Sequence, residues 1–193
     1  KSRARGDGEP IAVITTPNTN PFEQLWVGLI HVGFDAEKVA FVREPSPTLF
    51  QDLAVKLPEV PQFLILIDQF EELFTRIPKK DRKLRNTFVE ALVNASTSAQ
   101  TPVPPSPSHP FTPAKVILAM RDDFFGHLRD HKNLFEITDA NLQRIVAMEG
   151  AELREVIEAP AHSHGVRLED GLTDRIVKAV EGRSGMLPLL QYT

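Results

Sequence analysis

Mainly apolar residues form three short runs along the chain, at 11–15, 63–67 and 115–120. Apolar and polar residues do not alternate within them, which is typical of strands buried on both faces of a parallel sheet. Pro10 and Pro17 bound the first run, and proline is common at strand ends because it cannot donate to a ladder. The three runs therefore predict parallel strands, and a fourth run, at 144–148, predicts one more.

Helical periodicity fills most of the segments between these runs. Apolar residues recur at three- and four-residue spacing in segments that begin at Pro21 or cover 48–55, 69–74, 80–95 and 124–130. From Gly150 onward the pattern is helical alone, over 151–158, 170–181 and from Leu187. Strands that alternate with helices predict an α/β domain over residues 1–149, with a parallel sheet flanked by helices. The helices that follow predict the start of a small all-helical lid over 150–193.

The composition of the chain indicates which partners and which cellular location to expect. The chain has 193 residues, 41% of them hydrophobic, and a formal net charge of -4. An acidic chain has no global basic field, so nucleic acid is not expected as a partner. No apolar run is long enough for a transmembrane helix, so no membrane partner is expected either. The absence of cysteine fits a cytoplasmic protein. A proline-rich stretch, 102–113, predicts a surface loop or a disordered insertion.

An acidic residue, Asp68, directly follows the second apolar run. In open α/β sheets ligands bind beyond the carboxyl ends of the strands, so this carboxylate is expected to face a ligand. It could hold Mg²⁺ through a water molecule while the ion bridges nucleotide phosphates. Glu71 and Glu72 follow, and one of them could orient or deprotonate an attacking water. The alternative is a capping box, in which Asp68 and Glu71 satisfy free amides at a helix start.

An arginine, Arg121, follows the third apolar run in the same way. A guanidinium fixed at a strand end could contact the γ-phosphate and distinguish ATP from ADP, because its planar fork matches phosphate oxygens. The alternative is an ion pair with Asp122 or Asp123. Further along, His127 and His131 have the spacing of one helix face, which we interpret as a solvated face rather than a metal site.

Four motifs occur in order along the chain. They are Asp68–Phe74, Arg121–Phe124, Ala159–Ala161 with Gly165 following, and Leu187–Gln191. Together they resemble the novel STAND NTPases of bacterial multidomain regulators, which are relatives of the NACHT and NB-ARC switches and are often fused to WD-repeat propellers. The resemblance covers residues 11–193 and implies a P-loop NTPase-like sheet.

The resemblance also implies a function and roles for particular residues. It implies a regulatory ATPase that binds ATP with Mg²⁺ and acts as a nucleotide-dependent signalling switch in a larger protein. Asp68 is then the Walker B magnesium ligand, Glu71 or Glu72 the catalytic acid, and Arg121 the sensor. Pro188 is expected against the nucleotide base, although its motif is one residue longer than the Gly-x-Pro of NB-ARC relatives. The alternative for this proline is the first turn of a helix. Protein partners are expected through appended domains, and a homo-oligomer on activation.

The sequence departs from the family at the phosphate-binding loop. No Walker A motif, G-x-x-x-x-G-K-[ST], occurs anywhere in it. In the family this loop precedes the strand predicted at 11–15, so the loop is expected upstream or to have been lost. Its backbone amides and lysine supply most of the phosphate affinity. The chain by itself is therefore expected to bind ATP poorly and to be inactive.

Two other functions remain open at this point. A non-hydrolysing interaction scaffold would keep the acidic and sensor positions only as caps and ion pairs. A mechanical P-loop ATPase, acting on nucleic acid or protein, would need a basic channel or an aromatic stacking platform. An acidic chain with one Trp and one Tyr does not favour it.

Overall fold

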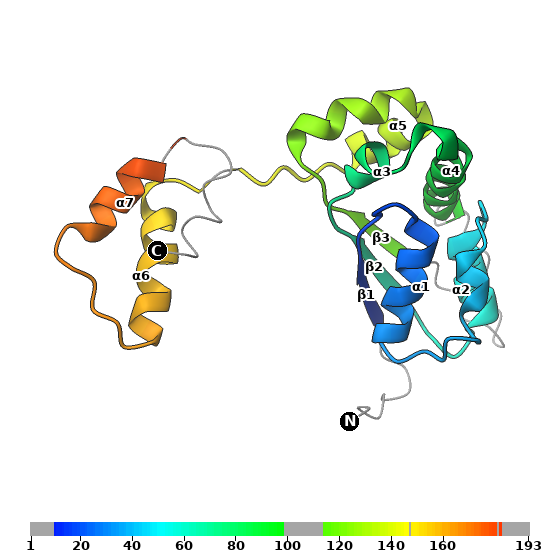
Figure 1. The fold of residues 1–193 in the computed structure, drawn as a ribbon, viewed down its shortest axis with the longest axis horizontal. Helices are drawn as coiled ribbons and strands as arrows, with labels where there is room; N and C mark the ends of the chain where they lie inside the picture. Colours follow the sequence, from blue (N-terminus) through cyan, green and yellow to red (C-terminus); the bar gives the residue numbers. More distant parts are fainter. Residues whose placement is uncertain (1–9, 99–113, 147, 181, 183–193) are drawn as a thin grey trace. The chain divides into compact units, whose positions relative to one another are not determined.

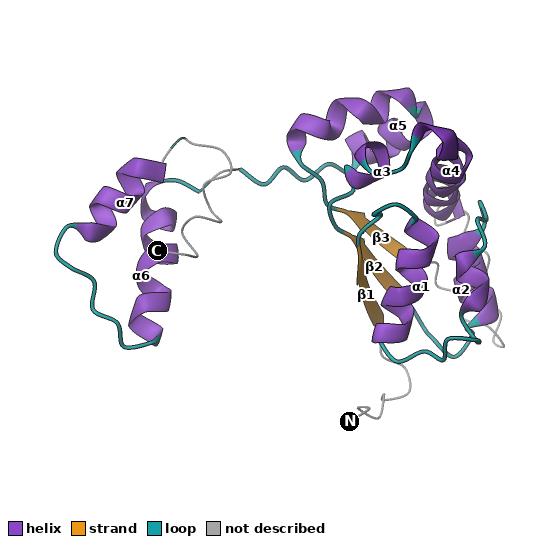
Figure 2. Ribbon diagram, viewed as in Figure 1, coloured by secondary structure: helices purple, strands orange, loops and turns teal. Residues whose placement is uncertain are grey.

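The chain forms two compact units in the computed structural model, which describes residues 10–98, 114–146, 148–180 and 182 (Figure 1). The first unit is Lys1–Leu142 and the second is Gln143–Thr193. All strands of the described residues lie in the first unit. In the second, the helices are α6 (Gly150–Ser163) and α7 (Leu172–Val180) (Figure 2). The predicted α/β class, with a parallel sheet flanked by helices, is confirmed.

Three parallel strands form the sheet of the first unit. They are β1 (Ile11–Thr15), β2 (Phe63–Ile67) and β3 (Lys115–Leu118), in the spatial order β1-β2-β3. The register aligns Val13 with Ile65 and Ile65 with Val116, so the three carboxyl ends lie at one edge of the sheet. The first two strands have the predicted bounds, and the third is shorter than predicted.

Helices follow each strand of this unit. Among the described residues they are α1 (Pro21–His31), α2 (Leu49–Lys56), α3 (Glu72–Thr75), α4 (Arg82–Ser98) and α5 (Lys132–Ala140), with the 3-10 helices η1 (Ala40–Arg43), η2 (Lys79–Asp81) and η3 (Asp122–Asp130). The helices α1, α2 and α4 cover the same face of the sheet (Figure 1). The side chains that point to them include Val13, Phe63 and Ile65, which are at most 1% exposed. This face therefore holds the core.

Local chemistry explains where α1 begins and how closely it packs. The Asn20 side chain accepts hydrogen bonds from the amides of Phe22 and Glu23, and Pro21 occupies the first turn. Gly28 brings the helix against β1, because a Cβ built on it would lie 2.8 Å from Val13 Cγ1. The helix thus starts at an asparagine cap and packs closely on the sheet at a glycine.

The second unit has buried apolar residues on both of its described helices and ion pairs at Arg154. Leu153 of α6 and Val180 of α7 are buried. The Arg154 guanidinium pairs with Asp174 of α7 and, at 3.4 Å, with Glu158 of its own helix. A lid of helices was predicted here, over 150–193, and α6 and α7 lie within that range.

One predicted strand is wrong, and one predicted site residue lies outside the described residues. The run at 144–148 was predicted as a strand, but its described residues Arg144, Ile145, Val146 and Met148 belong to no strand. Ile145 is 99% exposed and Val146 is 80% exposed, so no described strand pairs with this segment. An apolar β-branched run becomes a strand only where a neighbour completes its ladder. Pro188 and the helix predicted from Leu187 lie outside the described residues, as does the proline-rich loop.

Candidate functional site

The turn after β2 connects the carboxyl ends of all three strands. The Asp68 amide donates to the Thr15 carbonyl at 2.8 Å, at the end of β1. Two residues later, the Phe70 amide donates to the Ala119 carbonyl at 2.9 Å, just beyond β3. The side chain of Phe70 is fully buried and anchors the turn in the core. Asp68 therefore lies at the middle of the sheet edge where ligands of α/β folds bind.

Gln69 bends the backbone sharply within this turn. Its φ is 50°, in the left-handed region that residues other than glycine seldom adopt. The Gln69 amide donates to Asp68 Oδ1 at 2.9 Å, which fixes the carboxylate at the strand end. Asn18, in the turn after β1, has a φ of 47° at the same edge. Strained backbone of this kind is concentrated at functional sites.

Glu71 and Arg121 come together at this edge. Glu71 Oε2 lies 3.4 Å from the backbone nitrogen of Arg121, although the two residues are distant in sequence. Strands β2 and β3 are neighbours, so their carboxyl ends bring the two residues side by side. The capping box predicted as an alternative is not formed, because no side chain caps α3.

Glu72 is held differently from Glu71. Its Oε2 accepts the Asn18 amide at 3.0 Å, and its Oε1 pairs with Arg76 Nε at 2.8 Å. The residue is 8% exposed. Both carboxylate oxygens are thus bound within the protein, and they tie α3 to the turn after β1. The Asn18 contact could not be predicted from the sequence, in which the one signal is the tolerance of asparagine for left-handed backbone.

The Arg121 side chain points along the following 3-10 helix. Its Nη2 pairs with Asp123 Oδ2 at 2.8 Å, and its guanidinium carbon lies 5.4 Å from the centre of the Phe124 ring. The arginine side chain is 69% exposed. The ion pair expected as the alternative role of Arg121 is therefore formed with Asp123. Exposed pairs of this kind contribute about 0–1 kcal/mol, so the guanidinium is easily released.

Two histidine rings stack on phenylalanine rings beside the site; His127 is exposed, as expected of a solvated face, whereas His131 is half-buried. The His127 ring lies 6.0 Å from that of Phe74 and 5.7 Å from that of Phe124, nearly parallel to both. The His131 ring lies 5.9 Å from Phe74. Burial lowers the pKa of His131, and the nearby charge of Arg85 lowers it further. The stack holds η3 against α3.

The site has a carboxylate suited to a magnesium ion. Within the described parts of the chain, no group of three or more His, Asp or Glu side chains forms a metal-binding arrangement. Mg²⁺ does not need one, because it retains several waters and binds through one or two carboxylates together with substrate phosphates. Asp68 is exposed at the strand end, and its Oδ1 accepts the neighbouring amide. A water-mediated ion is compatible with this geometry.

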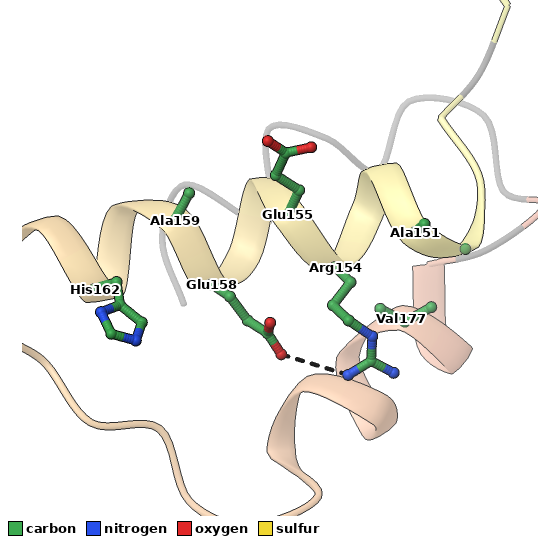
Figure 3. Close-up of a pocket in the computed structure, with 8 residues that line it drawn as sticks. Ala151, Arg154, Glu155, Glu158, Ala159, His162 and Val177 are labelled. Carbon is green, nitrogen blue, oxygen red and sulfur yellow. Dashed lines mark hydrogen bonds and ion pairs between the residues drawn. The ribbon is translucent and has the colours of Figure 1, made fainter.

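A shallow hollow lies on the second unit and offers less chemistry. Arg154, Glu155, Glu158 and His162 line it from α6, and Val177 lines it from α7 (Figure 3). The Arg154 guanidinium is already paired with two carboxylates. The positive charge of this guanidinium is therefore compensated within the unit.

Comparison with known proteins identifies a family. The family model described as Novel STAND NTPase 1 matches residues 2–193. Curated proteins and solved structures gave no match. Within the described residues, no helix is both long and apolar enough to cross a membrane. Since the family model covers almost the whole sequence, the chain belongs to the Novel STAND NTPase 1 family and is a STAND NTPase module.

Proposed function

We propose that the chain contributes the magnesium and γ-phosphate side of an ATP site and works as a nucleotide-dependent switch in a larger signalling protein. The main support is the placement of Asp68, Glu71 and Arg121 at one edge of neighbouring parallel strands. Ligands bind at this edge in open α/β sheets. The phosphate-binding loop is expected from polypeptide outside this sequence, which contains no Walker A motif.

Asp68 is the proposed magnesium residue. The Gln69 amide and the ladder to β1 fix the carboxylate at the strand end. It binds the ion through a water, and the ion when bound neutralises charge on the phosphate oxygens. Because the backbone at Gln69 is already in its bent conformation, the carboxylate needs no rearrangement before the ligand arrives.

Glu71 is the better candidate for the catalytic acid, and Glu72 for a supporting residue. Glu72 has both oxygens engaged, with Asn18 and Arg76. Glu71 makes one long contact, with the Arg121 amide, so it is more easily directed at a water. A carboxylate at the γ-phosphate would orient that water and accept its proton.

Arg121 is the proposed sensor. Its guanidinium pairs with Asp123 and lies over the Phe124 ring. The γ-phosphate offers three anionic oxygens in place of one carboxylate, and a planar guanidinium matches them bidentately. ATP and ADP would therefore leave Arg121 in different positions, and η3, which begins at the next residue, would report the difference.

The remaining elements of the proposal rest on the sequence. Pro188 is proposed to contact the nucleotide base, residues 150–193 to form the start of the lid, and residues 1–149 the nucleotide-binding domain. Nucleotide binding would change the packing of the lid, and appended domains would respond to that change. A homo-oligomer would form on activation. A cytoplasmic location fits the absence of cysteine.

The proposal is tested by the magnesium dependence of ATP binding. In the product of the complete gene, Asp68→Ala should remove the gain in ATP affinity that Mg²⁺ provides, while leaving the circular dichroism spectrum unchanged. Isothermal titration calorimetry with and without Mg²⁺ measures this gain. Asp52→Ala is the matched control, since Asp52 lies on α2 and its carboxylate accepts hydrogen bonds from the Ser46 and Thr48 hydroxyls at that helix start. An unchanged magnesium dependence in Asp68→Ala would reject the assignment.

A second candidate function is a non-hydrolysing interaction scaffold. The Arg121–Asp123 ion pair favours it, because it gives the proposed sensor side chain a partner within the protein. On this hypothesis Arg121→Ala changes the stability of η3 but leaves ATP affinity unaltered. The switch predicts the opposite, a lower preference for ATP over ADP with little change in stability.

A further inference from the structure

Positive charge is concentrated in one short stretch of the first unit, although the chain as a whole has a formal net charge of -4. The stretch covers η2 and the first turn of α4, and the acid within it is Asp81. Four of its five lysines and arginines are exposed, and the fifth is half-buried. We call these five residues the basic strip: Lys79, Lys80, Arg82, Lys83 and Arg85.

The basic strip is not neutralised by neighbouring carboxylates. Two other exposed cations of the unit are paired, Lys38 with Glu59 and Arg43 with Glu23. In the part of the chain that the structure describes, none of the strip residues forms an ion pair. The buried Nε of Arg85 has no hydrogen-bond acceptor there either, although buried donors are normally satisfied. The five cations are therefore available to an external anion.

The strip does not serve the stability of its own helix. A helix N-terminus carries partial positive charge, so acids stabilise the first turn and cations destabilise it. The first turn of α4 contains no acid, in contrast to that of α1, which contains Glu23. It begins instead with Arg82 and Lys83. Departures from such local rules are expected at functional sites, so these cations indicate binding rather than folding.

The positive potential extends from the strip to the start of α5. Helices α4 and α5 are in contact. Burial lowers the pKa of His131, and the charges of Arg85 and Arg82 lower it further, whereas Asp130 raises it. Both guanidinia therefore lie close to this ring. Asp81 and Asp130 offset only part of the positive charge at this end of the unit.

The dimensions of the strip suit a short extended segment. A 3-10 helix such as η2 rises about 2.0 Å per residue and an α-helix such as α4 about 1.5 Å, so the strip is about 11 Å long. Three or four residues of extended polypeptide span about the same distance. A long polyanion would also meet the acidic remainder of the chain, which would repel it.

The surroundings of the strip favour a protein over a membrane or a nucleic acid. A helix that lies in a membrane interface presents apolar side chains to it. Among the described residues of η2 and α4, no large apolar side chain is exposed. Surfaces for single-stranded nucleic acid add aromatic rings on which bases stack, whereas the aromatic residue of α4, Phe88, is 1% exposed. A carboxylate-rich protein segment needs neither feature.

We propose that the basic strip binds an acidic segment of a partner protein, rich in aspartate and glutamate and bound in extended form. The planar guanidinia of Arg82 and Arg85 each match a carboxylate, and the three lysines add point charges. Complementary charge of this kind steers association and fixes register. The strip contains none of the residues proposed for the ATP site, so the inference does not depend on nucleotide binding.

An acidic peptide tests the inference. A fluorescein-labelled peptide of about eight alternating Asp and Glu residues is long enough to cover the strip. It is titrated with the product of the complete gene and followed by fluorescence anisotropy. Lys80→Glu combined with Lys83→Glu should weaken binding at least about tenfold, because two attractions become repulsions. Acids favour a helix start, so the Tm of this variant should not fall.

Arg167→Glu combined with Lys178→Glu is the matched control. Both residues are exposed in the second unit, and the replacements change the net charge by the same amount as those in the strip. Peptide affinity should change by less than about twofold in this variant, because distant exposed charges are screened by salt.

Two competing polyanions are measured alongside the peptide, a single-stranded oligonucleotide of equal charge and vesicles of phosphatidylcholine with phosphatidylserine. The inference predicts that both bind more weakly than the peptide. Absence of peptide binding at about 50 mM salt, or an equal loss of affinity in the two variants, would overturn it. Tighter binding of the oligonucleotide or the vesicles, lost in the Lys80→Glu and Lys83→Glu variant, would overturn it in favour of a nucleic acid or a membrane.

Discussion

Replacement of Glu72 should destabilise the fold, whereas replacement of its neighbour Glu71 should not. Glu72→Ala leaves the Asn18 amide without its charged acceptor, a loss of about 1.5–3 kcal/mol. The pair with Arg76 adds only about 0.5 kcal/mol, because that guanidinium is 57% exposed. The total is about 2–3.5 kcal/mol, which lowers Tm by roughly 4–14 °C for a protein of this size. Glu71→Gln keeps an oxygen that can accept the Arg121 amide, and the original contact is long, at 3.4 Å, so a loss of less than about 0.5 kcal/mol is expected.

The rate of ATP hydrolysis should depend more on Glu71 than on Glu72, the reverse of the effects on stability. In the product of the complete gene, Glu71→Gln should reduce the rate of ATP hydrolysis by about 10²-fold or more, as expected for loss of a general base. Glu72→Gln keeps an oxygen for the Asn18 amide, so it should retain most of the rate. Thermal unfolding followed by circular dichroism and a phosphate-release assay measure the two effects. The assignment is refuted if Glu71→Gln unfolds as early as Glu72→Ala, or if Glu72→Gln alone abolishes hydrolysis at full stability.

Three further outcomes are expected. Gly28→Ala should lower the free energy of unfolding by about 1 kcal/mol, since overpacking against β1 exceeds the gain in helix propensity. Gly126→Ala, whose Cβ meets nothing within 4 Å, should change it by less than about 0.5 kcal/mol in urea denaturation. The lowered pKa of His131 means that the unfolded chain takes up its proton first as pH falls below 6.5, so stability should decrease from pH 7.5 to 5.5. His131→Gln should flatten that dependence, and an unchanged slope would contradict the role of burial. Asp123→Asn should release Arg121 from its ion pair and raise ATP affinity by up to about fivefold, because an exposed ion pair contributes at most about 1 kcal/mol. A lower ATP affinity in calorimetry would instead show that the ion pair supports the site.

The strands and the position of the site were predictable because their signals are local. Residues 11–15 and 63–67 are apolar runs without alternation, and both became strands with the predicted bounds. Since parallel strands share one carboxyl edge, Asp68 and Arg121 had to lie at that edge once both runs were strands. The register of β2 and β3 places them there.

The predictions that were wrong or missing concern contacts between residues distant in sequence, which a single sequence does not reveal. The run at 144–148 has the composition of a strand, yet Ile145 is 99% exposed and has no strand beside it among the described residues. The different environments of Glu71 and Glu72 could not be predicted either, because they depend on the Asn18 amide, which is distant in sequence and binds Glu72. The helix α5 was not predicted; its buried residue is Leu134, and Phe135 packs against the core.

The central claim is that magnesium and the triphosphate occupy the sheet edge beyond β2 and β3. Iron-dependent backbone cleavage tests it most directly, with Fe²⁺ in place of Mg²⁺, ATP and ascorbate added to the product of the complete gene, and the cut sites mapped by mass spectrometry. The account predicts ATP-dependent cuts within a few residues of both Asp68 and Arg121, lost in Asp68→Ala. Cuts confined to other segments, or cuts at these two positions that do not require ATP, would contradict it.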